Sequence, residues 1–263
     1  MAIDRLKAMV RGTALEEPLK VLLAPLIRPF RTEWVRRAHR DDKAMRRLLK
    51  RVLRPDSNVV DVGCNVGEFL EQVRRHAPRG THVAVEPLPH LAEALAARFP
   101  NVRVERCALG AESGVATFHH VVEMTGWSGF NRQEYPRDVT VEEIEVAVRT
   151  LDDVVGEEAT VDLVKIDVEG AEMSALRGGR SLFRRARPVV IFEHARVHNR
   201  TYGTTPEEVH DLLVGECGYE IRDLSLSERF DREGLRRIFD RSFETDYDRN
   251  AHTNFVAWPV GRG

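Results

Sequence analysis

A turn between an apolar stretch and a helical stretch is the first feature of the sequence that could bind a ligand. Residues 59–62 read Val-Val-Asp-Val, and the turn that follows holds Gly63 and Gly67. Glycine lets the backbone turn tightly and come close to a ligand, because it has no Cβ atom. A helix that begins near Gly67 would also direct free backbone N–H groups to the same place. The pattern predicts a nucleotide-type site at the carboxyl edge of a parallel sheet.

The spacing around this turn narrows the choice of ligand. A dinucleotide fingerprint needs glycine at positions 65 and 68, where Asn65 and Glu68 stand, and no Gly-Lys-Ser/Thr phosphate loop follows. An acidic strand end with a loose Gly-x-x-x-Gly turn suits a ligand that carries a cationic amino group and no phosphate. S-adenosylmethionine is such a ligand, and Asp61 can face its ammonium end directly or through water. We therefore expect Asp61, Gly63, Asn65 and Gly67 to bind the cofactor.

The second and third strand ends support the same interpretation. Residues 82–85 lead to Glu86, 25 positions after Asp61, where a carboxylate can accept hydrogen bonds from both ribose hydroxyls. NAD sites also use a carboxylate to bind the ribose hydroxyls. An NAD-type oxidoreductase and a non-catalytic cofactor-binding protein therefore stay open as alternatives. Cys107 and Ala108 follow the third strand, where adenine would lie. We interpret Cys107 as a packing residue rather than a nucleophile.

Polar residues at two further strand ends could catalyse methyl transfer to an oxygen. The acceptor must be held in line with the leaving sulfur, and its proton needs a base or a metal ion. Lys165 and Asp167 share one face of a strand. Lys165 either forms a structural pair with Asp167 or Asp61, or it supports Asp167 in positioning the acceptor, removing a proton or binding a metal. On the next strand, His194 could act as the base with Glu193 orienting it.

A divalent cation is the second way to activate a hydroxyl. The ligands that could converge on one ion are Asp167, Glu169, Glu193 and His194. The sequence holds no denser carboxylate–histidine cluster, so a metal-independent reaction is an alternative, and His198 is a weaker candidate for the base. The turn at residues 167–170, after the strand at residues 161–166, lacks the Asn/Asp-Pro-Pro-aromatic pattern of many N-methyltransferases, which favours an oxygen acceptor. Residues 123–132 form either a lid over a polyhydroxylated substrate or a solvated crossover loop.

The candidate site residues must be positioned by strands and helices, which the sequence predicts from alternating β-branched runs and amphipathic stretches. The runs expected to form the main strands are residues 59–62, 82–85, 102–106, 161–166, 189–192, 220–224 and 254–258. The stretches expected to form helices are residues 32–53, 68–76, 90–99, 172–185 and 206–217. Residues 114–120 and 144–150 predict two extra strands, and Thr205 to Glu208 predicts a capping box. This order is typical of an α/β fold with a parallel sheet.

Two stretches give the sequence a specific resemblance. Residues 150–153 (Thr-Leu-Asp-Asp) and residues 161–172, which contain Lys-Ile-Asp-Val-Glu-Gly-Ala-Glu, resemble the FkbM family of S-adenosylmethionine-dependent methyltransferases. The resemblance covers roughly residues 55–260. It implies a Rossmann-like class I methyltransferase, with a seven-stranded, mostly parallel sheet and helices on both faces. It also implies O-methylation of a sugar, a glycan or another natural product.

Composition sets the remaining expectations. The net charge of −2 argues against a nucleic-acid partner, and three cysteines are too few for a disulfide framework, which fits the cytoplasm. The apolar run at residues 21–27 is far too short to span a membrane. We expect an N-terminal helical segment at residues 1–54, with a homo-oligomerisation arm as one interpretation, and a methyltransferase domain at residues 55–263.

Overall fold

The computed structural model describes residues 33–135, 138–241 and 253–261. The chain divides into two compact units, residues 1–40 and residues 41–263. Of the first unit, the described part is the beginning of helix α3 (Glu33–Val52). The predictions for residues 1–32, including the oligomerisation arm, lie outside the described residues. The predicted division of the chain at residue 54 stays a prediction.

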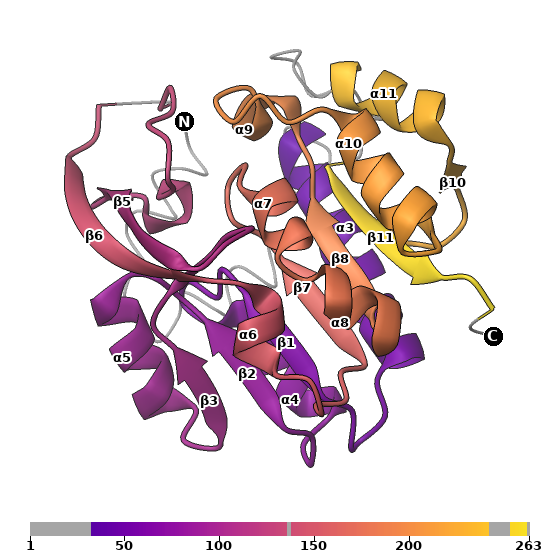
Figure 1. Cartoon of the computed structure of the whole chain (residues 1–263), viewed down its shortest axis with the longest axis horizontal. Helices are drawn as coiled ribbons and strands as arrows, with labels where there is room; N and C mark the ends of the chain where they lie inside the picture. Colours follow the sequence, from indigo (N-terminus) through magenta and orange to yellow (C-terminus); the bar gives the residue numbers. More distant parts are fainter. Residues whose placement is uncertain (1–32, 136–137, 242–252, 262–263) are drawn as a thin grey trace, which may run out of the picture. The chain divides into compact units, whose positions relative to one another are not determined.

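A predominantly parallel sheet forms the centre of the larger unit (Figure 1). In the described residues its order is β10-β9-β11-β8-β7-β1-β2-β3. The strands are β1 (Val59–Val62), β2 (His82–Val85), β3 (Val102–Glu105), β7 (Leu163–Ile166), β8 (Val189–Glu193), β9 (Tyr219–Asp223), β10 (Arg229–Phe230) and β11 (Asn254–Pro259). Strands β10 and β11 run antiparallel to their neighbours. The α/β fold and all seven expected main strands are confirmed, and β10 adds a two-residue edge strand.

Helices cover both faces of this sheet because its central strands are apolar on both sides. Val60 and Val164 pack toward helices α7 (Glu172–Arg177) and α8 (Arg180–Arg185). Val59 and Leu163 pack on the opposite side, where Leu49 of α3 and Val73 of α4 (Glu68–His76) cover them. Burying one such aliphatic side chain stabilises the fold by about 1.5–3 kcal/mol. Helix α5 (Pro89–Arg98) connects β2 to β3.

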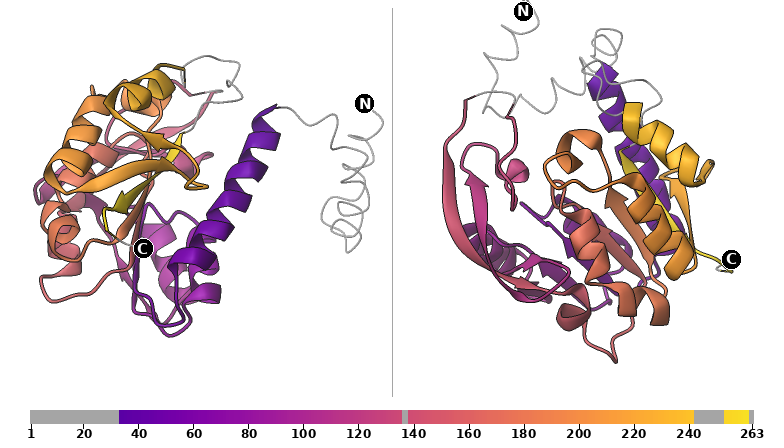
Figure 2. Two further views of the ribbon diagram at one scale, coloured as in Figure 1. Left: turned by 90° about the vertical axis from the view of Figure 1, so that its right-hand side faces the viewer. Right: turned by 45° about the horizontal axis from the view of Figure 1, so that its top comes forward.

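The chain segment between β3 and β7 of the main sheet forms a second, smaller sheet (Figure 2). Its order is β4-β6-β5, with β4 (Ala108–Leu109), β5 (Gly114–Val121) and β6 (Val141–Arg149). The two extra strands expected from the sequence are β5 and β6, which pair antiparallel. The short helix η2 (Thr125–Trp127) lies between them, and α6 (Leu151–Val155) leads back to β7.

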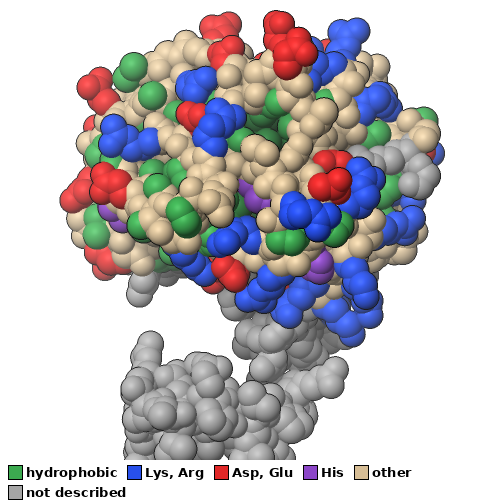
Figure 3. Space-filling view, turned by 90° about the horizontal axis from the view of Figure 1, so that it is seen from below, with side chains coloured by type: hydrophobic (Ala, Val, Ile, Leu, Met, Phe, Trp, Pro, Cys, Tyr) green, Lys and Arg blue, Asp and Glu red, His purple; other side chains and the backbone are tan. Residues whose placement is uncertain are grey.

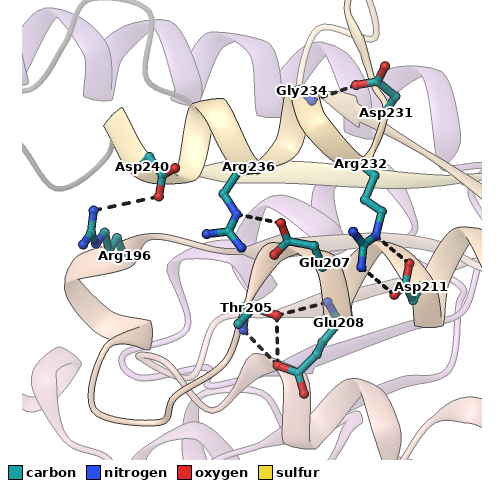
Figure 4. Close-up of polar contacts among 10 residues, drawn as sticks. All are labelled: Arg196, Thr205, Glu207, Glu208, Asp211, Asp231, Arg232, Gly234, Arg236 and Asp240. Carbon is teal, nitrogen blue, oxygen red and sulfur yellow. Dashed lines mark hydrogen bonds and ion pairs between the residues drawn. The ribbon is translucent and has the colours of Figure 1, made fainter.

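Charged pairs hold the last described helix, α11 (Arg232–Arg241), against α10 (Pro206–His210) and η3 (Asp211–Glu216) (Figure 4). Arg236 Nε donates to Glu207 Oε1 over 2.6 Å, and Arg232 Nε donates to Asp211 Oδ1 over 3.1 Å. Thr205 and Glu208 form the predicted capping box at the start of α10. Helix α9 (Arg196–Asn199) lies beside them, and its Arg196 Nη1 is 3.8 Å from Asp240 Oδ1 of α11.

The described surface carries both signs of charge. Lysine and arginine side chains alternate with aspartate and glutamate on the face shown in Figure 3. Among the described residues, no helix combines the length and the apolar character needed to cross a membrane.

Candidate active site

The turn after β1 and the end of β7 are in direct backbone contact. Gly63 has a φ of 77°, and a Cβ atom there would lie 1.9 Å from the carbonyl oxygen of Asp167. No other residue fits this position, because both the left-handed backbone and the close approach exclude a side chain. The contact brings the predicted cofactor turn next to the predicted catalytic strand end.

Glu86 is a buried carboxylate held in place by backbone donors. Its side chain is 4% exposed, Oε2 accepts from the backbone N–H of Asn65 over 2.8 Å, and Oε1 accepts from that of Leu88 over 3.0 Å. Burial raises the pKa of Glu86, and the two backbone hydrogen bonds oppose that rise. An ionised carboxylate has about four acceptor positions, so about two stay available to a ligand.

A cavity opens at this edge of the sheet, and we call it the edge pocket. Its empty volume, including the space open to solvent, is about 690 Å³. The wall contributed by the main sheet and its turns consists of Val62, Gly63, Asn65, Val85, Glu86, Pro87, Leu88, Cys107, Asp167, Val168, Glu169 and Ala171. The wall contributed by the small sheet and its loop consists of Ala108, Leu109, Phe118, Thr125, Gly126, Ser128 and Phe130.

Five of the seven residues expected to contact the cofactor line the edge pocket, namely Gly63, Asn65, Glu86, Cys107 and Ala108. Burial raises the pKa of Cys107 to about 11, which agrees with a packing role. Gly67 precedes α4 and does not line the pocket. Asp61 is fully buried behind the pocket wall, so its contact with a cofactor stays a prediction.

Lys165 connects two aspartates beneath the edge pocket. Its Nζ lies 2.9 Å from Asp167 Oδ2 and 3.9 Å from Asp61 Oδ1. Burial alone would lower the pKa of Lys165, but the carboxylates of Asp167 and Asp61 outweigh it and raise the pKa above its ordinary value. Lys165 is therefore a fixed cation, and Asp167, whose side chain is 35% exposed, faces the pocket from one side of this ion pair.

Glu169, Glu193 and His198 come together beside Asp167. One ligand atom of each lies within 4.8 Å of the other two, and His198 Nδ1 lies 3.0 Å from Glu169 Oε2. Burial would lower the pKa of His198, but Glu169 and Glu193 raise it to about 9. Burial raises the pKa of Glu193 well above its ordinary value, and Asp167 adds to that rise. The group is rich in carboxylates and almost enclosed.

Gly170 allows α9 to bring His198 to this group. Its φ is 109°, and a Cβ atom there would lie 2.4 Å from the carbonyl oxygen of His198 and 2.6 Å from the ring of Tyr202. The glycine of the Lys-Ile-Asp-Val-Glu-Gly stretch is therefore needed for close packing of α9 on the β7 turn.

Similarity to known proteins identifies the family of this chain. Residues 61–221 match the model of the "Methyltransferase FkbM domain". The chain belongs to the FkbM methyltransferase family. The 31-O-demethyl-FK506 methyltransferase FkbM of Streptomyces tacrolimicus is 34% identical over 157 residues, which cover 48% of this chain and 60% of that protein. The 2-O-methyltransferase NoeI of Sinorhizobium fredii is 27% identical, covering 67% and 79%.

A solved FkbM structure shows a looser likeness. The methyltransferase FkbM of Methylobacillus flagellatus is 18% identical to this chain and has a TM-score of 0.48, with 78% of this chain and 44% of that one covered. The chain thus spans less than two thirds of both the Methylobacillus and the Streptomyces FkbM proteins. The sequence resemblance to the FkbM family is confirmed.

The structure of this FkbM domain does not bring His194 to the edge pocket. His194 is fully buried, and its ring stacks on Phe239 of α11 with the centroids 4.6 Å apart. Burial lowers its pKa to about 4. Glu193 and His194 are neighbours in an extended segment, so their side chains point to opposite faces, and only Glu193 joins the group beside the pocket.

The loop of the FkbM domain between β5 and β6 covers the edge pocket and the acidic group. Thr125 Oγ1 donates to Asn65 Oδ1 over 3.0 Å. The rings of Trp127 and His198 pack edge to face, with their centroids 5.4 Å apart. Gln133 Nε2 donates to the carbonyl oxygen of Glu169, and Gln133 Oε1 lies 3.3 Å from His198 Nδ1. Thr125, Gly126, Ser128 and Phe130 of this loop line the pocket, and a role of the loop as a lid stays a prediction. Gln133 had no signal in the sequence.

Proposed function

We propose that this FkbM domain transfers a methyl group from S-adenosylmethionine to a hydroxyl of a sugar, a glycan or another natural product. The observation that carries the proposal is Glu86, a buried carboxylate that is held by backbone donors and lines a pocket of about 690 Å³. Its remaining acceptor positions fit the two hydroxyls of a ribose. Family membership supports methyl transfer, rather than the NAD-type alternative, as the use of this pocket.

The residues around Glu86 fit the rest of the cofactor. Gly63 lines the pocket, and its lack of a side chain lets the turn after β1 pack on the backbone of Asp167. Cys107 and Ala108 offer an apolar wall on the side where the adenine is expected, and Asn65 lies between Glu86 and Thr125. Asp61 lies behind this wall and acts on the ammonium group through its charge or through water. S-adenosylmethionine, when bound, supplies an electrophilic methyl group whose sulfur keeps the electron pair of the broken bond.

Asp167 accepts the proton of the acceptor hydroxyl in this proposal. Lys165 holds Asp167 Oδ2 at 2.9 Å, which leaves Oδ1 to face the edge pocket and fixes the direction of the carboxylate. A carboxylate in this position can take the proton while the acceptor oxygen bonds to the methyl carbon. Lys165 is a positioning residue, because its ammonium group touches Asp167 and not the acceptor.

Relatives and loop composition support an oxygen acceptor. The names of the two relatives, 31-O-demethyl-FK506 methyltransferase and 2-O-methyltransferase, both specify methylation at oxygen. Phe130 lines the edge pocket and Trp127 lies beside His198, so aromatic faces are available near the place where a sugar ring would enter.

Calorimetry separates the candidate functions. The protein is titrated with S-adenosylhomocysteine, the product of the reaction, and with NAD. We expect saturable binding of S-adenosylhomocysteine and no binding of NAD, and binding of NAD alone contradicts the proposal. Transfer of labelled methyl groups to a panel of hydroxylated acceptors then separates an enzyme from a cofactor-binding protein, because the latter gives no labelled product.

A further inference from the structure

Glu169, Glu193 and His198 have the donor atoms and the spacing of a metal site. Three separate elements supply them: the turn after β7, the end of β8, and α9. One oxygen or nitrogen of each side chain lies within 4.8 Å of the other two, a separation that a small contraction around an ion would close. Among the residues that the structure describes, this is the group whose spacing suits a metal ion.

One carboxylate oxygen beside this group has no protein partner among the described residues. It does not belong to Glu169, because Glu169 Oε2 lies 3.0 Å from His198 Nδ1. Glu172 is 1% exposed. Its Oε1 accepts from the backbone N–H groups of Val168 and Gly170, while its Oε2 is buried and unpartnered among the described residues. Buried polar atoms without partners are costly, and a bound ligand is one explanation for them.

Several carboxylates surround His198. His198 faces the carboxylates of Glu169, Glu193 and Glu172, and Asp167 lies close to Glu193. Lys165 does not offset this charge, because its Nζ is already between Asp167 and Asp61. A divalent ion bound to the neutral imidazole of His198 would place positive charge among these carboxylates at one point.

We propose that Glu169, Glu193 and His198 bind a divalent first-row transition metal ion that holds the acceptor hydroxyl at the edge pocket. Two carboxylates and one imidazole form a mixed donor set that suits Mn²⁺ or Zn²⁺ better than Mg²⁺, which prefers oxygen ligands alone. Three protein ligands leave positions open on the ion. Glu169 also lines the edge pocket, so an acceptor there can reach an open position beside Asp167.

The role of the ion rests on the proposed function, whereas the binding of the ion does not. An acceptor hydroxyl bound to the ion has a lower pKa, so its proton passes more easily to Asp167 as the oxygen–methyl bond forms. Gln133 and Trp127 would hold His198 and shield the ion from the loop side.

Metal binding is tested on the full chain without cofactor. The protein is dialysed against a chelator and titrated with Mn²⁺, and free Mn²⁺ is followed by electron paramagnetic resonance. We expect one saturable site per chain and at least about a 10–100-fold weaker affinity in Glu193→Gln and in His198→Asn. Glu142→Gln is the matched control, because Glu142 also lies beside a histidine, with Oε2 3.4 Å from His120 Nδ1, on the exposed strand β6. Its affinity should be unchanged.

Circular dichroism confirms that each variant is folded, and Zn²⁺ is titrated as a second probe. No saturable binding of either ion by the folded wild type overturns the proposal, as does wild-type affinity in both site variants. S-adenosylhomocysteine binding by the metal-free protein is measured in parallel. Cofactor binding without metal binding overturns only the metal site, and metal binding without cofactor binding overturns only the proposed function. Full methyl transfer after chelation refutes the catalytic role of the ion.

Discussion

His194 directly follows β8 and His198 lies in α9, only four positions later, yet their side chains lie in two regions of different composition. His198 lies beside Glu169 and Glu193, and these carboxylates raise its pKa to about 9. His194 lies behind β8, stacks on Phe239 and has its pKa lowered to about 4 by burial. The pKa of the same side chain is thus raised beside the carboxylates on the pocket side and lowered on the α11 side. The neighbours, rather than the residue type, decide which histidine can take part in chemistry.

The largest expected effect is a loss of turnover on substitution on the pocket side, compared with little loss on the α11 side. Asp167→Asn removes the proposed proton acceptor while keeping the shape, so turnover should fall about 10²–10⁴-fold with little change in the affinity for S-adenosylhomocysteine. His194→Phe keeps the ring stack on Phe239, and its turnover should stay within about threefold of the wild type. The measurement is methyl transfer to an acceptor identified in the panel. The comparison fails if His194→Phe loses turnover while Asp167→Asn keeps it.

Several residues of the edge pocket could be predicted from the sequence, because they directly follow apolar runs that form strands. Glu86 follows β2 directly, and Gly63 and Asn65 follow β1, so parallel pairing alone brings them to one edge. Asp61 lies within β1 instead, and its side chain is enclosed by the core beneath the pocket.

The placement of the histidines could not be predicted in the same way. We expected Glu193 to orient His194, although the alternation of side chains along an extended segment already separates the two. His198 depends on the turn between β8 and α9 and on the tight contact of α9 with Gly170, which no local pattern encodes. Gln133 reaches Glu169 across 36 positions of sequence, and only the tertiary fold shows that contact.

A pH dependence of stability should come from the α11 side. The folded pKa of His194, about 4, lies below its ordinary value of 6.5, so the unfolded chain binds more protons between these two values. The contribution of neutral His194 is therefore complete above pH 6.5 and is lost as the pH falls toward 4. Between pH 7.5 and pH 5.0 the loss should be about 2 kcal/mol.

Urea unfolding of the wild type and His194→Phe at pH 7.5 and pH 5.0 measures this difference. The variant cannot take up the proton, so its free energy of unfolding should fall by about 2 kcal/mol less than that of the wild type. Equal losses in both proteins would show that His194 does not lie in an apolar site.

A smaller effect is expected from the helix cap on the α11 side, which contributes to the free energy of unfolding. Thr205→Ala removes the side chain that caps α10 and should lower the free energy of unfolding by about 1 kcal/mol. Turnover should not change, because Thr205 does not line the edge pocket. Thr205→Ser keeps the capping oxygen and serves as the control, and a loss of stability in Thr205→Ser equal to that in Thr205→Ala would argue against the cap.

The central claim is that the edge pocket holds S-adenosylmethionine through the carboxylate of Glu86. Calorimetry with S-adenosylhomocysteine on the wild type, Glu86→Ala and Glu93→Ala tests it most directly, since Glu93 is an exposed glutamate on the neighbouring helix α5. Hydrogen bonds to a charged group contribute about 1.5–3 kcal/mol, so Glu86→Ala should weaken binding about 10–100-fold while Glu93→Ala binds like the wild type. Wild-type affinity in a folded Glu86→Ala protein would contradict the account.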